Sequence, residues 1–172
     1  MSRLFIANIF RLIILVPIQV LILDKIHLGG YVNPFLYLFF ILLIPFETPG
    51  WLLLISSFLI GFAVDLFSGT PGMHSAACVL MAFVRPLVIR SIDVNKEFEP
   101  GLQPSIRDLG IRWFVSYALI LVFIHHMALF FLEVFRFSGF FDTLQRALLS
   151  TVFTVTLVII SQYLFMKTSP RR

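Results

Sequence analysis

The residues best placed to do chemistry lie in the stretch GFAVDLFSGTPGMHSAA, residues 61–77. Asp65 stands near the end of a long apolar run, where an ionised side chain costs about 3 kcal/mol or more without a partner. Two local roles stay open. Asp65 accepts hydrogen bonds from backbone amides at the start of the next helix, where a carboxylate is favoured, or it pairs with His74. A ligand-binding or proton-handling role is the functional alternative. The candidate residues are Gly61, Asp65, Gly69, Pro71, Gly72 and His74.

The turn inside this stretch predicts a tight helical hairpin. Pro71 fixes one backbone angle, and Gly69 and Gly72 supply the conformations that a reversal needs. The apolar helices on either side must then be antiparallel. Gly61, with the alanine pair at 76–77 opposite, leaves little side-chain bulk, so the two backbones can approach closely.

Other ionisable residues interrupt apolar segments. Arg85, in AFVRPLVIR, has three possible environments: an acidic partner, backbone carbonyls freed by Pro86, or the cytoplasmic interface reached by snorkelling. Adjacent helical residues such as His125 and His126 point about 100° apart, whereas paired metal ligands usually stand at i and i+4. A shared metal site is therefore not predicted, and we expect one of the two histidines to face the bundle.

A set of charged and titratable residues falls at one end of the predicted bundle. It either surrounds an outward-facing pocket or is ordinary interfacial charge. Within the set, Asp142 and Arg146 are spaced i, i+4 and can pair on one helix. The set comprises Asp24, Lys25, His27, Glu133, Arg136, Asp142 and Arg146.

The sequence contains no pattern typical of an enzyme. Nucleophile–base arrangements, phosphate-binding loops, dinucleotide fingerprints and zinc motifs are missing from it. The single cysteine, Cys78, lies in an apolar segment and is interpreted as a small buried residue. We predict no catalytic activity, no cofactor and no bound metal. The net charge of +4 is attributed to basic residues at a membrane face, not to nucleic-acid binding.

The elements that position these residues are apolar helices. The chain has 172 residues, of which 59% are apolar and only 13% are charged, against about 25% charged in soluble domains. This composition predicts an all-α integral membrane protein whose single domain spans residues 1–172. Six segments approach the roughly 20 apolar residues that a membrane-crossing helix needs. They cover residues 5–23, 31–46, 51–67, 73–92, 113–135 and 141–166.

The basic residues orient the predicted spans. Most lysines and arginines fall at one face if both termini are cytoplasmic, which satisfies the positive-inside rule. The loop over residues 93–110 is then cytoplasmic, and the turn after Asp65 faces outside. We expect a multi-pass protein of the bacterial inner membrane, in contact with the lipid bilayer.

The region from Asn33 to Pro86 resembles MreD, the rod shape-determining membrane protein family of bacteria, in its Bacteroidetes-like form. The resemblance rests on a glycine and an aspartate that end one span, followed by a glycine-containing turn and a small-residue helix. A second matching turn is IPFETP, residues 44–49. The first element corresponds here to Gly61, Asp65, Gly69, Gly72, His74 and Ala76.

The resemblance implies a function that spacing alone does not. MreD-like proteins are non-enzymatic members of the cell-elongation machinery and associate with MreC, a single-span protein. Through MreC they connect to a RodA-type glycosyltransferase, its transpeptidase and MreB filaments. They are thought to scaffold or regulate peptidoglycan synthesis and so rod shape. Their fold is similar to the six-helix substrate-binding subunits of energy-coupling-factor transporters.

That similarity supplies the alternative hypothesis, a subunit that binds a vitamin or metal for transport. Such subunits commonly present an Ala-x-x-x-Ala face on the first helix to their coupling partner. Here Ala7 is followed at that spacing by Arg11, which breaks the pattern. The scaffold hypothesis is therefore preferred.

Overall fold

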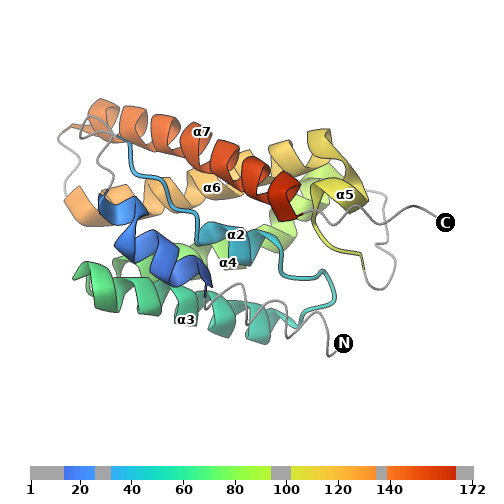
Figure 1. Ribbon diagram of the computed structural model, residues 1–172, viewed down its shortest axis with the longest axis horizontal. Helices are drawn as coiled ribbons and strands as arrows, with labels where there is room; N and C mark the ends of the chain where they lie inside the picture. The colour runs from blue at the N-terminus through green and yellow to red at the C-terminus, as the bar shows by residue number, and fades with distance from the viewer. Residues whose placement is uncertain (1–13, 26–31, 94–101, 135–138, 166–172) are drawn as a thin grey trace.

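Four long apolar helices form the frame of the molecule (Figure 1). The computed structural model describes residues 14–25, 32–93, 102–134 and 139–165, and all regular structure in those ranges is helical. The predicted all-helical class is confirmed for the described residues, and by length and composition the four helices are able to cross a membrane, which supports the predicted membrane protein. They are α3 (Gly50–Ser68), α4 (Met73–Ile92), α6 (Ile111–Val134) and α7 (Phe140–Phe165).

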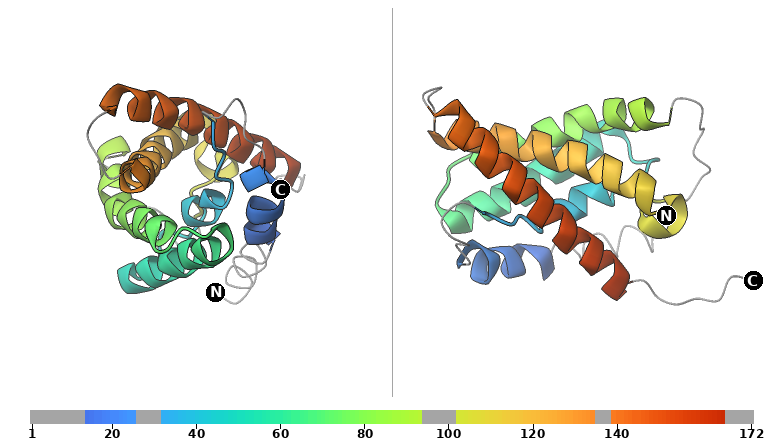
Figure 2. Two further views of the ribbon diagram at one scale, coloured as in Figure 1. Left: turned by 90° about the vertical axis from the view of Figure 1, so that its left-hand side faces the viewer. Right: turned by 90° about the horizontal axis from the view of Figure 1, so that it is seen from above.

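The packing order places α4 at the centre of the frame. It lies against α3 on one side and α6 on the other, and α6 also packs against α7. Helix α7 crosses the other helices obliquely, as the view from above shows (Figure 2). The outward faces are apolar: Phe67, Phe83 and Leu164 are each more than 60% exposed. Apolar surface of this extent is typical of contact with lipid.

The first predicted span, residues 5–23, lies partly outside the described residues. Residues 14–21 are helical and lead into the short 3₁₀ helix η1 (Leu23–Lys25). This segment is joined to the end of α3 by a hydrogen bond from Ser68 Oγ to Asp24 Oδ2, at 2.6 Å.

The structure corrects the second predicted span, over residues 31–46. Only five of its residues form a helix, α2 (Leu38–Leu42), and residues 33–35 before it are not helical. The physical reason is Pro34, which lacks an N–H group and disfavours the helical conformation of the residue before it. Residues 31–46 are therefore apolar enough to suggest a span but do not form a spanning helix.

Side chains from neighbouring helices replace the missing helical hydrogen bonds. The amide of Phe35 donates to Thr154 Oγ1 of α7 at 3.1 Å. Gln19 acts twice: its Oε1 accepts from the Leu36 amide at 2.8 Å, and its Nε2 donates to the Pro34 carbonyl at 2.9 Å. Non-helical backbone at membrane depth is tolerated only where protein surrounds it.

Helix α2 fills the middle of the bundle (Figure 1). Tyr37 and Leu38, where it begins, and Ile41 and Leu42, where it ends, are completely buried. The second apolar segment therefore runs through the inside of the four-helix frame. It leads from the end that holds the α3–α4 turn, where Asn33 and Ser68 line one cavity, to the end where α3 begins at Gly50 (Figure 1).

The loop predicted over residues 93–110 contains the short helix α5 (Ile106–Leu109). Ser105 caps it by accepting a hydrogen bond from the Asp108 amide at 3.2 Å. The Ile106 amide donates to Gln162 Oε1 of α7 at 2.8 Å, which fixes this part of the loop against the bundle. Residues 94–101 of the loop lie outside the described ranges.

Candidate functional site

The Asp65 carboxylate is the centre of the α3–α4 hairpin. Its Oδ1 accepts hydrogen bonds from the His74 amide and from Thr70 Oγ1, both at 3.0 Å. Its Oδ2 accepts from the Ser75 amide at 2.9 Å and from Ser75 Oγ at 2.6 Å. Of the two roles left open, the structure shows the first: Asp65 caps the N-terminus of α4, where unpaired amides and the helix dipole favour a negative charge.

Gly61 allows the two helices of the hairpin to touch. A Cβ atom placed on it would lie 2.6 Å from Ser75 Cα and 2.7 Å from the His74 carbonyl oxygen. The contact opposite Gly61 is therefore the backbone of these two residues, and the predicted contact with the alanine pair at 76–77 is corrected. Ala77 is buried but Ala76 is exposed, because α4 is rotated to direct its first turn at α3.

The turn between the helices uses two glycines in the left-handed region. Gly69 has φ 69° and ψ 27°, and Gly72 has φ 82° and ψ −4°. The Asp65 carbonyl accepts from the amides of Gly69, at 3.1 Å, and Thr70, at 3.3 Å, which closes the end of α3. Since L side chains rarely adopt these angles, both positions favour glycine.

A line of three polar side chains runs from the hairpin into the bundle. The Tyr37 hydroxyl lies 2.8 Å from His74 Nδ1 and 2.9 Å from His125 Nε2. With one proton, the hydroxyl donates to one ring and accepts from the other. Cys78 Sγ lies 3.8 Å from the same His125 nitrogen. His74 therefore contributes its backbone to Asp65 and its ring to Tyr37.

Both adjacent histidines face the interior, which corrects the expectation of one. His125 and His126 are completely buried, because α6 packs against α4 on one side and α7 on the other. His126 Nδ1 lies 2.7 Å from the Val122 carbonyl oxygen, and its Nε2 lies 3.4 Å from Thr154 Oγ1. The Phe35 ring packs on both, with centroid separations of 6.0 and 5.2 Å.

Arg85 is almost fully buried, and its guanidinium binds polar groups near the C-terminal end of α2. Its Nε donates to the Tyr117 hydroxyl at 2.6 Å, and its Nη2 donates to the Ile44 carbonyl. Tyr117 in turn donates to the Leu42 carbonyl at 3.1 Å. The carbonyls come from the α2 segment, not from the turn freed by Pro86. A cation beside these carbonyls is favoured, because carbonyls at a helix C-terminus carry partial negative charge.

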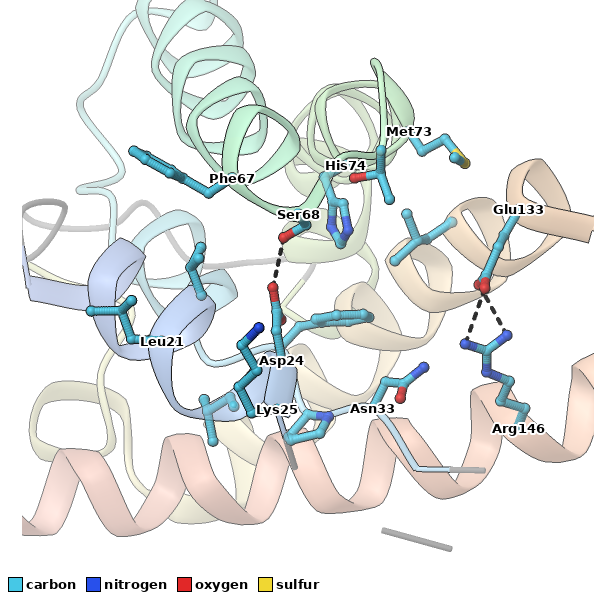
Figure 3. Close-up of a pocket in the computed structure, with 16 residues that line it drawn as sticks. Leu21, Asp24, Lys25, Asn33, Phe67, Ser68, Met73, His74, Glu133 and Arg146 are labelled. Carbon is cyan, nitrogen blue, oxygen red and sulfur yellow. Dashed lines mark hydrogen bonds and ion pairs between the residues drawn. The ribbon is translucent and has the colours of Figure 1, made fainter. Parts of the chain in front are cut away.

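A cavity of about 540 Å³ opens at the end of the bundle where the α3–α4 turn lies (Figure 3). Its polar lining includes Asp24, Lys25, His74, Glu133 and Arg146. Most of the charged set therefore lines a real cavity, as one of the two interpretations of that set predicted. His27 and Arg136 lie outside the described residues.

The ion pair at this end of the molecule differs from the predicted one. Arg146 Nη1 lies 2.9 Å from Glu133 Oε2, and the guanidinium stacks on the Phe130 ring at 4.1 Å from its centroid. The predicted partner was Asp142, on the same helix as Arg146. Glu133 replaces it because α6 and α7 pack side by side and bring the two charges together across the helix interface.

Several polar residues of this interior were not singled out by the sequence analysis. In the described part of the chain, no group of three His, Cys, Asp or Glu side chains could hold a metal ion. The polar interior depends instead on hydroxyl and amide groups within apolar segments. A polar residue at membrane depth is a usable signal, but its partner is set by the fold. The residues missed are Gln19, Tyr37, Ser75, Tyr117 and Thr154.

Comparison with known proteins yields no match: no family model, no curated protein and no solved structure is similar to this chain.

Proposed function

We propose that this chain is a non-enzymatic membrane subunit of the bacterial cell-elongation machinery, similar to MreD. In this role it associates with an MreC-like single-span partner and scaffolds or regulates peptidoglycan synthesis. The RodA-type glycosyltransferase, its transpeptidase and MreB filaments are indirect partners. A topology of six crossings, similar to that of energy-coupling-factor substrate subunits but with the second crossing made by the mostly non-helical α2 segment, belongs to the same proposal, as do the inner-membrane location and the cytoplasmic termini.

The observation that carries the proposal is the α3–α4 hairpin. The residues on which the resemblance rests act together there: Gly61 permits the close approach, and Asp65 caps α4. The hydrogen bonds of Asp65 and Arg85 go to this chain's own backbone and side chains. Buried polar groups that hydrogen-bond within the chain favour a structural role for these residues, since they hold the helices in a fixed arrangement that partners can contact.

Affinity purification after brief crosslinking in cells tests the proposal, with partners identified by mass spectrometry. The expected result is recovery of a single-span MreC-like protein together with cell-wall synthases. The same purification with Gly61→Ala is the test variant. It is expected to lower recovery of these partners, because the added Cβ displaces α4. Absence of any cell-wall protein from the wild-type sample would overturn the proposal.

The cavity favours a second candidate, a substrate-binding subunit of an energy-coupling-factor-type transporter. Its volume of about 540 Å³ falls in the range typical of small-molecule sites, about 300–1,000 Å³. Recovery of two ATPases and a membrane coupling protein in the same purification would favour this candidate over the scaffold.

A further inference from the structure

The two sides of the end cavity differ in chemistry. Leu21 and Phe67 flank one side and are 70% and 69% exposed. The Glu133–Arg146 ion pair lies on the other side, and Asp24 and Lys25 lie between (Figure 3). An occupant that matches both sides is amphiphilic, with its apolar part toward Leu21 and Phe67.

Among the described residues, the charged lining of the cavity is balanced, with two acidic and two basic side chains. Among the described residues, Asp24 accepts hydrogen bonds from Gln19 Nε2 at 2.8 Å and from Ser68 Oγ at 2.6 Å, and both donors are neutral. Each terminal nitrogen of Arg146 uses one N–H on Glu133, at 2.9 and 3.4 Å, so each keeps a second N–H, whereas its Nε is buried without a hydrogen-bond partner among the described atoms. A guanidinium carries five N–H donors, so an additional anionic group can be accommodated.

We propose that this cavity binds the headgroup of a zwitterionic lipid that carries a phosphate and a primary amine. The phosphate lies toward Lys25 and Arg146, and the ammonium lies toward Asp24 and Glu133. The cavity volume of about 540 Å³ suits a headgroup and not two acyl chains, which leave past Leu21 and Phe67 into the bilayer. A purely anionic headgroup is disfavoured because it would place its charge beside two carboxylates.

This site goes beyond the scaffold function, which does not require a ligand. The phosphoethanolamine group has two sources, a bilayer lipid or a free soluble compound, and exposed Leu21 and Phe67 favour the lipid. Failure to recover cell-wall partners would leave this inference standing, and failure to bind lipid would leave the scaffold proposal standing.

Native mass spectrometry of the purified full chain tests the site. The protein in mild detergent is mixed with equal amounts of phosphatidylethanolamine and phosphatidylglycerol that carry identical acyl chains. A separate sample receives free phosphoethanolamine. We expect a one-lipid adduct with about tenfold preference for phosphatidylethanolamine, the factor that one charge-assisted contact supplies.

Two variants connect the adduct with the cavity. Met73→Trp fills the cavity without removing any of the contacts described above, and Arg146→Gln removes one of its two cations. Each is expected to lower the adduct about tenfold. The control is Arg107→Gln, which removes an exposed arginine from α5, and it should bind as the wild type does.

Three results would overturn the inference. Equal adducts with both lipids, or wild-type adducts in both cavity variants, would mean that the lipid lies on the outer surface. Adduct formation with free phosphoethanolamine and none with lipid would make the cavity a site for a soluble ligand and would strengthen the transport candidate.

Discussion

Gly61→Ala is the substitution for which the structure gives the sharpest expectation. The added Cβ would lie 2.6 Å from Ser75 Cα, about 0.8 Å inside the 3.4 Å at which ordinary contact begins. The nearest atoms are backbone, so no side-chain rotation relieves the clash. Helices α3 and α4 must move apart at this point.

The separation also reaches Asp65, one helical turn further along α3. Its hydrogen bonds from the amides of His74 and Ser75 are 3.0 and 2.9 Å long. A shift of about 0.8 Å takes both beyond the usual limit of about 3.2 Å. Overpacking alone costs about 1–3 kcal/mol, and weakening bonds to a charged acceptor adds to it. We expect the free energy of unfolding to fall by about 2–4 kcal/mol.

The assay is unfolding of the purified protein in mild-detergent micelles by titration with sodium dodecyl sulfate, followed by circular dichroism. Gly50→Ala is the matched control, since a Cβ at Gly50 has no atom within 4 Å. It should unfold within about 0.5 kcal/mol of the wild type, as surface substitutions usually do. The reasoning is refuted if Gly61→Ala unfolds at the same point as wild type and control.

Three further substitutions test other parts of the same interior. Asp65→Ala leaves two buried amides at the start of α4 without an acceptor and should lower both stability, by about 2–4 kcal/mol, and protein level in membranes; wild-type abundance would contradict the capping role. Gly72→Val places a β-branched residue at φ 82°, and no atom lies within 4 Å of the added Cβ. Backbone strain alone should therefore lower the free energy of unfolding by about 1–3 kcal/mol, and Gly72→Asn should lower it less. Equal unfolding of both variants and wild type would show that the turn relaxes. Tyr117→Phe removes the hydroxyl that joins Arg85 to α2 and should cost about 1–3 kcal/mol. Its effect should be non-additive with that of Arg85→Met, because the two side chains share one network, and additive effects in a double-mutant cycle would argue against that network.

The two apolar segments on either side of residues 47–50 show what hydropathy can predict and what it cannot. Residues 51–67 and 31–46 are both apolar enough to suggest a span, yet only the former is a long helix. High hydropathy indicates that a segment is shielded from water. It does not indicate whether lipid or other helices of the protein surround the segment, and for residues 31–46 Pro34 was the local signal against a regular spanning helix.

The polar side chains of the interior also differ in how far their partners lie along the sequence. For Asp65 the sequence narrowed the local role to two alternatives, capping of the next helix or pairing with His74, because its partners lie 5 to 10 residues away, across one turn. The partners of Arg85 lie 32 and 41 residues away, and that of Tyr37 on α6 lies 88 residues away. Such pairings depend on how helices pack, and no local pattern specifies them.

The sequence by itself determined the all-helical class, the four long helices, and the glycine–aspartate hairpin, because hydropathy, helix length and turn chemistry act over short stretches of chain. Only the tertiary structure decided that α2 is enclosed by the bundle, that Glu133 and not Asp142 pairs with Arg146, and that the charged end surrounds a cavity. These features come from the packing of helices distant in sequence, where the positions of partner groups are set by the whole fold.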